Sequence, residues 1–309
     1  MLDSPAPRKR KGEQALASGM GWAQTFIAVD WGTTNRRAWR IEDGQVAQEF
    51  EDGRGVLSID KADFPAAVAE IRQRLGDHPM LMAGMIGSNR GWVEAPYAPC
   101  PAGLDDIASV LAWAEQDRTA IIPGLSSAEP PDVMRGEEVQ IFGAVDAGLI
   151  PADALVCHPG THNKWVTLGR GKVTRFRTVM TGEMFSLLQK HSILSDLLKD
   201  EMAVDDAFRD GVRRGLEGDA VTAELFSVRA GVLLGKQRRE DATDYTSGLL
   251  IGADIGSSIA DHIGEVFVMG RPELTKLYAA ALGVAGRKAR EIDGETAFLA
   301  GIKAIAGQI

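Results

Sequence analysis

The sequence predicts an α/β protein built of two lobes. Short apolar strands alternate with amphipathic helices along the chain, a pattern typical of sheets covered by helices. A strand, turn and hairpin found in the first half occur again in the second half. The 309 residues can bury two cores. We therefore expect two domains, residues 23–150 and 151–309, with loops at the sheet ends facing a cleft between them.

The first half begins with an apolar strand, Thr25–Asp30, that runs into a Gly-Thr-Thr turn. A second strand, Arg37–Glu42, is followed by Asp43-Gly44 and a third strand from Val46, which together predict a β-hairpin. The remaining elements expected here are a helix at 63–75, strands at 79–84 and 121–122, and a helix at 133–148.

The second half repeats this order. After a strand at 154–156, the loop Gly160–Asn163 aligns with Gly32–Asn35, and the turn Arg170-Gly171 aligns with Asp43-Gly44 with one residue of slack. Chance similarity of two hairpins is the alternative, but the matching order of elements favours duplication. The remaining expected elements are helices at 182–191 and through the region up to about 262, a strand at 265–269, and helices at 273–282 and 295–305.

Composition favours small-molecule partners. There are 43 acidic and 34 basic residues, for a formal net charge of -9, so nucleic acid and anionic membrane surfaces are unfavourable partners. Cys100 and Cys157 form neither a disulfide framework nor a zinc pattern, which fits a reducing cytoplasm. No apolar run reaches the ~18 residues of a membrane span. The sequence does not indicate an oligomeric state, and a homodimer is compatible with it.

The segment before the first strand, residues 1–22, is expected to lie outside the fold. It carries the basic run Arg8–Lys11 but no apolar stretch of a signal peptide. We interpret it as a solvated extension, or as the result of a start codon placed too early, with Met20 as the true beginning. A basic targeting tail is the alternative.

The strongest chemical pattern follows the first strand: Asp30-Trp31-Gly32-Thr33-Thr34-Asn35-Arg36-Arg37. A tight Gly/Thr turn leaves amides and hydroxyls for phosphate oxygens. Asp30, at the strand end, can hold Mg²⁺ through water, since Mg²⁺ keeps several waters and takes few carboxylates. A plain hairpin turn is the alternative. The expected phosphate ligands in this loop are Gly32, Thr33, Thr34, Asn35 and Arg37.

This loop resembles the first phosphate loop of the glycerol- and xylulose-kinase group, in the actin-like (ribonuclease H-like) ATPase superfamily. Gly160-Thr161 resembles the second phosphate loop, and Gly270-Arg271-Pro272 resembles the adenosine-binding turn. The resemblance implies ATP and Mg²⁺ as cofactors, with the nucleotide on the second lobe and the substrate on the first. His158 stands where the superfamily often has Asp, so no metal ligand is expected in the second loop.

A narrower resemblance, to the 2-dehydro-3-deoxygalactonokinase family, extends over residues 25–309. It rests on the segments 84–89, 132–138, 159–165, 180–183 and 248–253. It implies phosphorylation of 2-dehydro-3-deoxy-D-galactonate at its 6-hydroxyl, in galactonate catabolism. A kinase of another sugar or sugar acid, and an actin-like nucleotide switch that is not a kinase, are the alternatives.

Phosphoryl transfer also needs a carboxylate to accept the hydroxyl proton. In the glycerol-kinase group an Asp after Gly at a helix start fills this role, and the matching residues here are Glu137 and Glu138 after Gly136. We favour Glu137, which follows the glycine directly, and keep Asp132 as a third candidate. Acids in a first helical turn also simply complement the helix dipole.

The substrate is expected to contact the loop after the strand at 79–84, namely Gly87, Ser88, Asn89 and Arg90. Arg90 could form a bidentate ion pair with a carboxylate, which suits a sugar acid. The alternative is a solvated loop arginine. Lys164, just after the second phosphate loop, could contact the substrate carboxylate or a phosphate.

Overall fold

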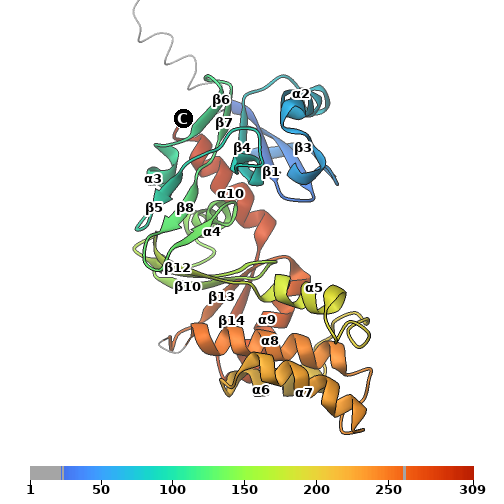
Figure 1. Ribbon diagram of the computed structural model, residues 1–309. Coiled ribbons are helices and arrows are strands. Elements are labelled where there is room, and N and C mark those ends of the chain that lie inside the picture. Colours follow the sequence, from blue (N-terminus) through green and yellow to red (C-terminus); the bar gives the residue numbers. More distant parts are fainter. Residues whose placement is uncertain (1–21, 23, 260–261) are drawn as a thin grey trace, which may run out of the picture. The chain divides into compact units, whose positions relative to one another are not determined.

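The structure is a computed structural model that describes Trp22 and residues 24–259 and 262–309. Its described residues form two compact units (Figure 1). Unit 1 holds the chain up to Ser126, together with Met134–Val139 and Leu299–Ile309. Unit 2 holds Ser127–Val133 and Gln140–Phe298.

This division differs from the sequence-based boundary after residue 150. The chain leaves unit 1 inside helix α4 (Glu137–Asp146) and returns to it inside helix α10 (Gly294–Ala306). A boundary inside a helix carries no Pro, Gly or polar linker, so composition could not reveal it.

Unit 1 is built on a six-stranded sheet with the order β3-β2-β1-β4-β7-β6. Strands β1 to β3 are antiparallel neighbours, whereas β4 and β7 run parallel to β1. Helix α2 buries its apolar face, including Phe64 and Ile71, against sheet residues such as Ile27 and Met82. The strands are β1 (Thr25–Trp31), β2 (Arg36–Glu42), β3 (Gln45–Asp52), β4 (Met80–Gly84), β6 (Ala112–Glu115) and β7 (Thr119–Ile121), and α2 is Phe64–Leu75.

Unit 2 is built on a five-stranded sheet with the order β12-β11-β10-β13-β14. Its hairpin strands are antiparallel, and β13 and β14 run parallel to β10. Helix α9 packs on this sheet through Leu277, Tyr278 and Ala281. The elements are β10 (Ala154–His158), β11 (Asn163–Gly169), β12 (Lys172–Val179), β13 (Val266–Gly270), α9 (Pro272–Val284) and β14 (Ala289–Asp293).

The internal repeat predicted from the sequence is present in both sheets. Each has the order third, second, first and fourth strand. Each hairpin turns through two residues with positive φ, Asp43-Gly44 (47° and 77°) and Arg170-Gly171 (55° and 75°). Each ladder also shifts register just before that turn. Because the turn and the irregularity recur together, the two halves share one backbone design.

Several short elements were missed by the sequence analysis. A three-stranded sheet contains β5 (Tyr97–Pro99), β8 (Gly124–Ser127) and β9 (Asp132–Met134). The helix expected from residue 133 begins only at Glu137, because Gly136 has a φ of 108° and separates it from β9. Strands of three or four residues are too short to show a periodicity. The other short elements are α3 (Leu104–Ala108) and the 3₁₀ turns Val56–Ser58, Lys61–Asp63 and Met85–Gly87.

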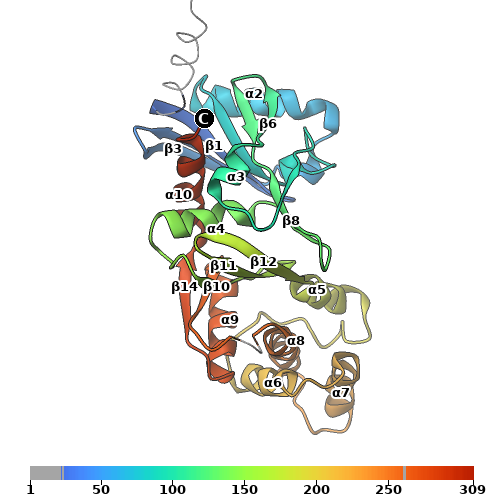
Figure 2. The ribbon, with the colours of Figure 1, turned by 90° about the vertical axis from the view of Figure 1, so that its left-hand side faces the viewer.

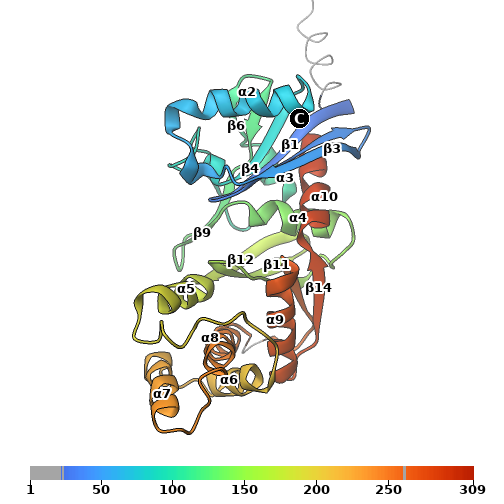
Figure 3. The same ribbon diagram turned by 90° about the vertical axis from the view of Figure 1, so that its right-hand side faces the viewer.

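The helices between β12 and β13 form a helical layer of unit 2 beside its sheet. Helices α6, α7 and α8 lie side by side in it (Figures 2 and 3). Helices α6 and α8 approach closely through glycines. A Cβ added at Gly211, Gly215, Gly248 or Gly252 would lie 2.1–2.3 Å from a carbonyl oxygen of the other helix. The segment 248–253 therefore serves helix packing. The helices are α5 (Thr181–His191), α6 (Asp206–Leu216), α7 (Val221–Leu233) and α8 (Ala242–Ser258).

Trp22 corrects the expected end of the N-terminal extension. Its side chain is 2% exposed, and its ring centroid lies 6.0 Å from that of Trp113 and 6.4 Å from that of Phe26. Trp22 therefore belongs to the core of unit 1, because a large aromatic side chain is stabilised by burial. Residues 1–21, to which the rest of that expectation applies, lie outside the described residues. No described helix is long and apolar enough to cross a membrane.

Gly252→Ala should lower the free energy of unfolding by about 1–3 kcal/mol, because the added methyl group must push α6 and α8 apart. Gly256→Ala in the same helix is the control, since its Cβ would lie 3.6 Å from the nearest atom, at Leu216. That change should be neutral or stabilising by up to ~1 kcal/mol, because alanine favours helix. Urea unfolding of the variants measures both effects. Equal stability of the two would contradict the close packing.

Candidate functional site

The first loop is held by its carbonyl groups. The carbonyls of Gly32, Thr33 and Thr34 accept hydrogen bonds from the amides of residues 55–57, at 2.9–3.2 Å. Thr33 and Thr34 are exposed, and no described backbone carbonyl accepts from their amides. Amides oriented in this way are suited to bind an anion.

A glycine supports each of the two loops. A Cβ at Gly55 would lie 2.3 Å from backbone atoms of Thr33 and Thr34, and a Cβ at Gly182 would lie 2.4 Å from the carbonyl oxygen of Gly160. Only glycine lets the following segment come so near. The sequence analysis missed this pair. Gly55 follows Gly32 at nearly the same spacing as Gly182 follows Gly160, and this repeated spacing could have indicated it.

Asp30 lies at the end of β1, beside the first loop. Its Oδ2 accepts a hydrogen bond from Nη2 of Arg37 at 2.8 Å, and the two side chains are 22% and 29% exposed. Arg37 lies opposite Asp30 on β2, so the hairpin register forms the pair. Arg37, expected to bind phosphate, also orients the carboxylate.

Two glycines bring the start of α4 to the same end of the sheet. Gly84 ends β4 with a φ of 89°, and a Cβ there would lie 2.8 Å from the carbonyl oxygen of Trp31 and 3.5 Å from Oδ1 of Asp30. Gly136 has a φ of 108°, and its Cβ would lie 3.3 Å from Cα of Gly84. Gly84 therefore lies against Asp30, and Gly136 lies against Gly84. Glu137 directly follows Gly136 in the sequence, so it is held near the same end of the sheet.

The two glutamates at the start of α4 have different environments. Glu138 is fully buried, and both its carboxyl oxygens lie within 2.8 Å of the Gly136 amide, which donates to them. Burial, aided by the neighbouring charge of Glu137, raises the pKa of Glu138 to about 8. Glu137 is half-buried, and its Oε2 accepts from the Arg135 amide at 3.0 Å. Glu137 is thus the carboxylate that a ligand can reach.

Asp132, the third candidate for a base, is engaged elsewhere. Its Oδ2 accepts from the Thr178 amide and its Oδ1 from the Thr178 hydroxyl, both at 2.6 Å. Oδ1 also accepts from the Val133 amide at 2.7 Å. These contacts tie β9 to the end of β12, so the geometry favours a structural role.

The expected substrate loop has two buried and two exposed residues. Gly87 and Ser88 are buried, and the Ser88 hydroxyl donates to the Met85 carbonyl at 2.7 Å, which closes the turn. Asn89 and Arg90 are exposed. Ser88 therefore shapes the loop, whereas Asn89 and Arg90 present its polar groups.

Arg135 is a residue that the sequence analysis did not single out. Its guanidinium stacks on the Tyr97 ring at 4.3 Å and donates from Nη2 to the Ala95 carbonyl at 2.8 Å. Its Nε and Nη1 are buried without a hydrogen-bond partner among the described residues. A Cβ at Gly87 would lie 2.9 Å from Nη1, so Gly87 makes room for this charge. In the sequence, the only indication of a role for Arg135 was its position directly before Gly136.

The second loop follows β10 in unit 2. His158, at the position of Asp30, has Nε2 3.0 Å from Oε1 of Gln140. Lys164 is 5% exposed and lies on β11 between His158 and Thr178. The Glu183 amide donates to the Thr161 carbonyl at 2.9 Å, which matches the support of the first loop.

The turn expected to bind adenosine begins helix α9. Gly270 ends β13 with a φ of 148°. The carbonyl of exposed Arg271 accepts from the amides of Leu274 and Thr275 at 3.0 Å, and Pro272 is the first helical residue. The turn therefore fixes the direction of α9.

A cavity of about 220 Å³ adjoins the second loop. It is lined by Gly160 and Thr161 and by mostly apolar residues of helices α5, α8 and α9, among them Phe185, Leu250 and Leu277. An apolar pocket beside an exposed threonine, Thr161, is typical of a small-molecule site.

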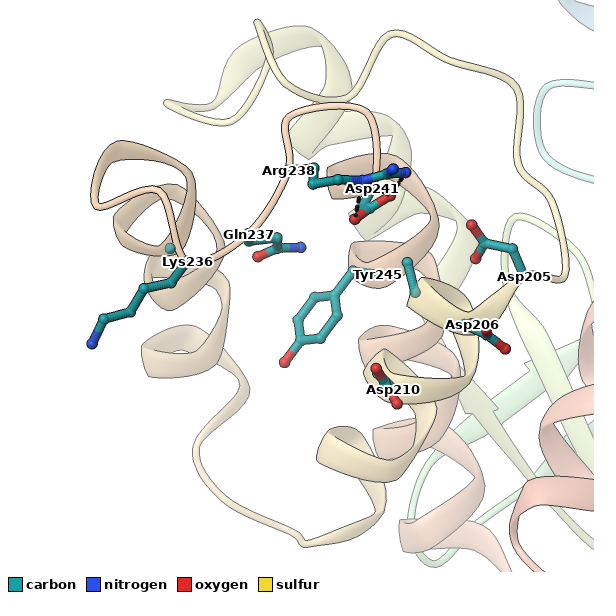
Figure 4. A pocket seen from close by; sticks show the side chains of 10 residues that line it. Asp205, Asp206, Asp210, Lys236, Gln237, Arg238, Asp241 and Tyr245 are labelled. Atoms are coloured by element: carbon teal, nitrogen blue, oxygen red, sulfur yellow. Dashed lines mark hydrogen bonds and ion pairs between the residues drawn. The ribbon is translucent and has the colours of Figure 1, made fainter.

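A larger cavity of about 680 Å³ lies among the helices of unit 2 (Figure 4). Four carboxylates and two cationic side chains line it, and Arg238 pairs with Asp241 at 2.7 Å. This excess of negative charge disfavours phosphate. Within the described ranges, no group of three or more His, Cys, Asp or Glu side chains is arranged to hold a metal ion. The carboxylates are those of Asp205, Asp206, Asp210 and Asp241, and the cations are Lys236 and Arg238.

The free energy of unfolding should fall as the pH rises from about 5 to 8. In this window the folded state keeps a proton on Glu138 (pKa about 8) that the unfolded state, with its ordinary value of 4.5, releases. The slope from one such group is at most about 1.4 kcal/mol per pH unit. Urea unfolding across this range should show a shallower slope for Glu138→Gln than for the wild type. Equal slopes for the variant and the wild type would mean that Glu138 is ionised in the folded state, which would contradict this prediction.

Known proteins resemble this chain over most of its length. The family model described as 2-keto-3-deoxy-galactonokinase matches residues 30–305. The chain is 39% identical over 288 residues to the 2-dehydro-3-deoxygalactonokinase of Escherichia coli (strain K12), covering 91% of this chain and 97% of that protein. A relative from Rhizobium meliloti (strain 1021) is also 39% identical, over 307 residues and 94% and 99% of the two chains.

The fold also matches a crystal structure of a 2-dehydro-3-deoxygalactonokinase-family protein from Sinorhizobium meliloti. The TM-score is 0.86 and the identity 39%, with 91% of this chain and 98% of that chain covered. The α/β fold expected from the sequence is confirmed by this likeness. The chain belongs to the 2-keto-3-deoxy-galactonokinase family.

Proposed function

We propose that this protein transfers the γ-phosphoryl group of ATP to the 6-hydroxyl of 2-dehydro-3-deoxy-D-galactonate, in the cytoplasm and as a step of galactonate catabolism. Membership of the kinase family over residues 30–305 is the observation that carries the proposal. The supporting identity extends over nearly the whole of the Escherichia coli kinase. Small molecules, rather than nucleic acid or membranes, are the proposed partners.

We assign the phosphate contacts of ATP to the amides and hydroxyls of the two loops. In support, the carbonyl groups of the first loop are taken up by residues 55–57, and Thr33, Thr34 and Thr161 are exposed. Asn35 and Arg37 complete the first loop, and Gly160 lets phosphate approach the backbone of the second.

We assign the adenosine to the cavity of about 220 Å³ beside Gly160 and Thr161. Its apolar walls suit a nucleobase, because burial of a flat apolar ring gains hydrophobic free energy. The Gly270–Pro272 turn supports this placement, since it begins the helix that supplies Leu274 and Leu277 to the wall.

Asp30 fits a magnesium site of the kind that nucleotides use. Its carboxylate is partly exposed and is oriented by Arg37, and Mg²⁺ needs only one or two protein carboxylates because it keeps its waters. Bound there, Mg²⁺ would neutralise charge on the phosphates. Asp30 supplies the negative charge that such a cation requires, and Arg37 keeps the carboxylate in place.

Glu137 is the proposed general base. The 6-hydroxyl of the substrate gives its proton to the Glu137 carboxylate. At the same time the hydroxyl oxygen bonds to the γ-phosphorus, and the bond between the γ-phosphorus and the oxygen of the leaving ADP breaks. The partial exposure of Glu137 and the full burial of Glu138, whose pKa is about 8, favour this assignment. The alternative within the pair is a base at Glu138.

The acid group of the substrate is assigned to the loop Gly87–Arg90. Arg90 can form two parallel hydrogen bonds with a carboxylate, and Asn89 can bind hydroxyl groups. Gly87 and Ser88 set the shape of the loop from buried positions. Lys164 is the remaining candidate, for a phosphate or for the substrate carboxylate.

The test is ATP-dependent phosphorylation of a panel of 2-keto-3-deoxy acids, including the galacto and gluco epimers, and neutral sugars. The galacto acid should be the best substrate. Asp30→Asn should lower kcat by about 10²-fold or more, because an electrostatic contribution to phosphoryl transfer is lost. Asp43→Asn, the same change in the exposed hairpin turn, is the control and should keep wild-type kcat.

Faster turnover of a neutral sugar than of any acid would overturn the substrate assignment. Near-normal kcat of Asp30→Asn with an ordinary Mg²⁺ dependence would overturn the metal assignment and leave the kinase assignment in place.

A further inference from the structure

We propose that Asp254 positions the nucleotide-binding part of unit 2, by joining the second loop and two walls of the adjacent cavity to one buried carboxylate. Asp254 lies on α8 and is 3% exposed. The inference rests on the proposed function only in assigning that cavity to ATP.

Three donors converge on one oxygen of Asp254. Its Oδ2 accepts from Nδ2 of Asn163, from the hydroxyl of Thr181 and from the hydroxyl of Tyr278, each at 2.7 Å. The donors come from β11, α5 and α9, so one carboxylate links three elements to α8. All three are neutral groups, and hydrogen bonds from neutral donors to a charged acceptor are stronger than those between neutral groups.

Two of the three donors belong to the cavity itself. Thr181 and Tyr278 line it, beside Gly160 and Thr161. Asn163 is the last residue of the second loop and the first residue of β11. The same oxygen therefore fixes the cavity walls and the end of the loop, and a change in its charge should be felt by a bound nucleotide.

The other oxygen of Asp254 provides an internal control. Its Oδ1 accepts from Nε1 of Trp165 at 2.8 Å. Trp165 is a buried core residue of β11 that packs in the hydrophobic core of unit 2, and it is not part of the cavity lining. Loss of the bond from Trp165 should affect stability without affecting the nucleotide.

Asp254→Asn keeps the shape of the side chain but replaces one acceptor oxygen by an NH₂ donor. In either orientation of the amide some bonds are lost and the rest lose their charged acceptor. The dissociation constant for ATP, measured by calorimetry, and KM for ATP should rise by roughly five- to fifty-fold. KM for the sugar acid should stay within about twofold, since its proposed contacts lie in other elements.

Thr181→Val gives a second test that leaves the carboxylate in place. It removes one hydroxyl and conserves the branched shape, and it should raise KM for ATP in the same direction. Trp165→Phe is the matched control, because it also removes one donor to Asp254. It should lower Tm and leave KM for ATP within about twofold of the wild type.

Unchanged ATP affinity in both Asp254→Asn and Thr181→Val, with a lowered Tm, would overturn the inference and leave the network only structural. If Asp254→Asn does not fold, the comparison of Thr181→Val with Trp165→Phe decides the question. A wild-type protein that binds no ATP would overturn the proposed function and this inference together.

Discussion

The close approach of Gly84 and Gly136 is the constraint on which the candidate catalytic residues depend. Strand β4 ends beside β1, and a side chain at Gly84 would collide with the backbone of Trp31. The backbone at Gly136 packs on Gly84 in turn, and helix α4 starts at the next residue. Only glycine fits at these two positions in this geometry. The close packing that the glycines allow brings the start of α4, and with it Glu137, to the end of the sheet where Asp30 lies.

The same constraint recurs in unit 2 with different chemistry around it. Gly270 ends the fourth strand of the repeat, and a Cβ at Gly294 would lie 3.1 Å from Cα of Gly270. Helix α10 starts there, as α4 starts after Gly136. The position of Asp30 is taken by His158, which pairs with Gln140. The duplicated backbone thus carries a carboxylate in unit 1 and an apolar cavity beside the second loop in unit 2.

The sequence predicted the elements that carry a strong local pattern. The strands at 25–30, 79–84 and 265–269 and the Gly-Thr loops have buried apolar runs or turn residues that show in the sequence, and the structure has them. The division inside α4 was not predictable, because a helix that continues from one unit into the other looks like any other helix. Trp22 was misassigned because a single aromatic residue beside a basic tail gives no periodic signal.

Site residues divide in the same way. Residues of the Gly-Thr loops are proposed from their spacing. Asp254 lies in a mostly apolar helix that also contains Asp244, and its donors lie far from it in sequence. Ser88 was expected to contact the substrate, but its hydroxyl closes a turn. The sequence favoured Glu137 over Glu138 only by its place directly after Gly136, because the difference in their burial does not show in the sequence. The most direct measurement is therefore kcat of Glu137→Gln beside Glu138→Gln. The account predicts a loss of about 10²–10⁴-fold for the first, with KM for ATP unchanged, and a mild effect for the second. Nearly full kcat in Glu137→Gln would contradict it.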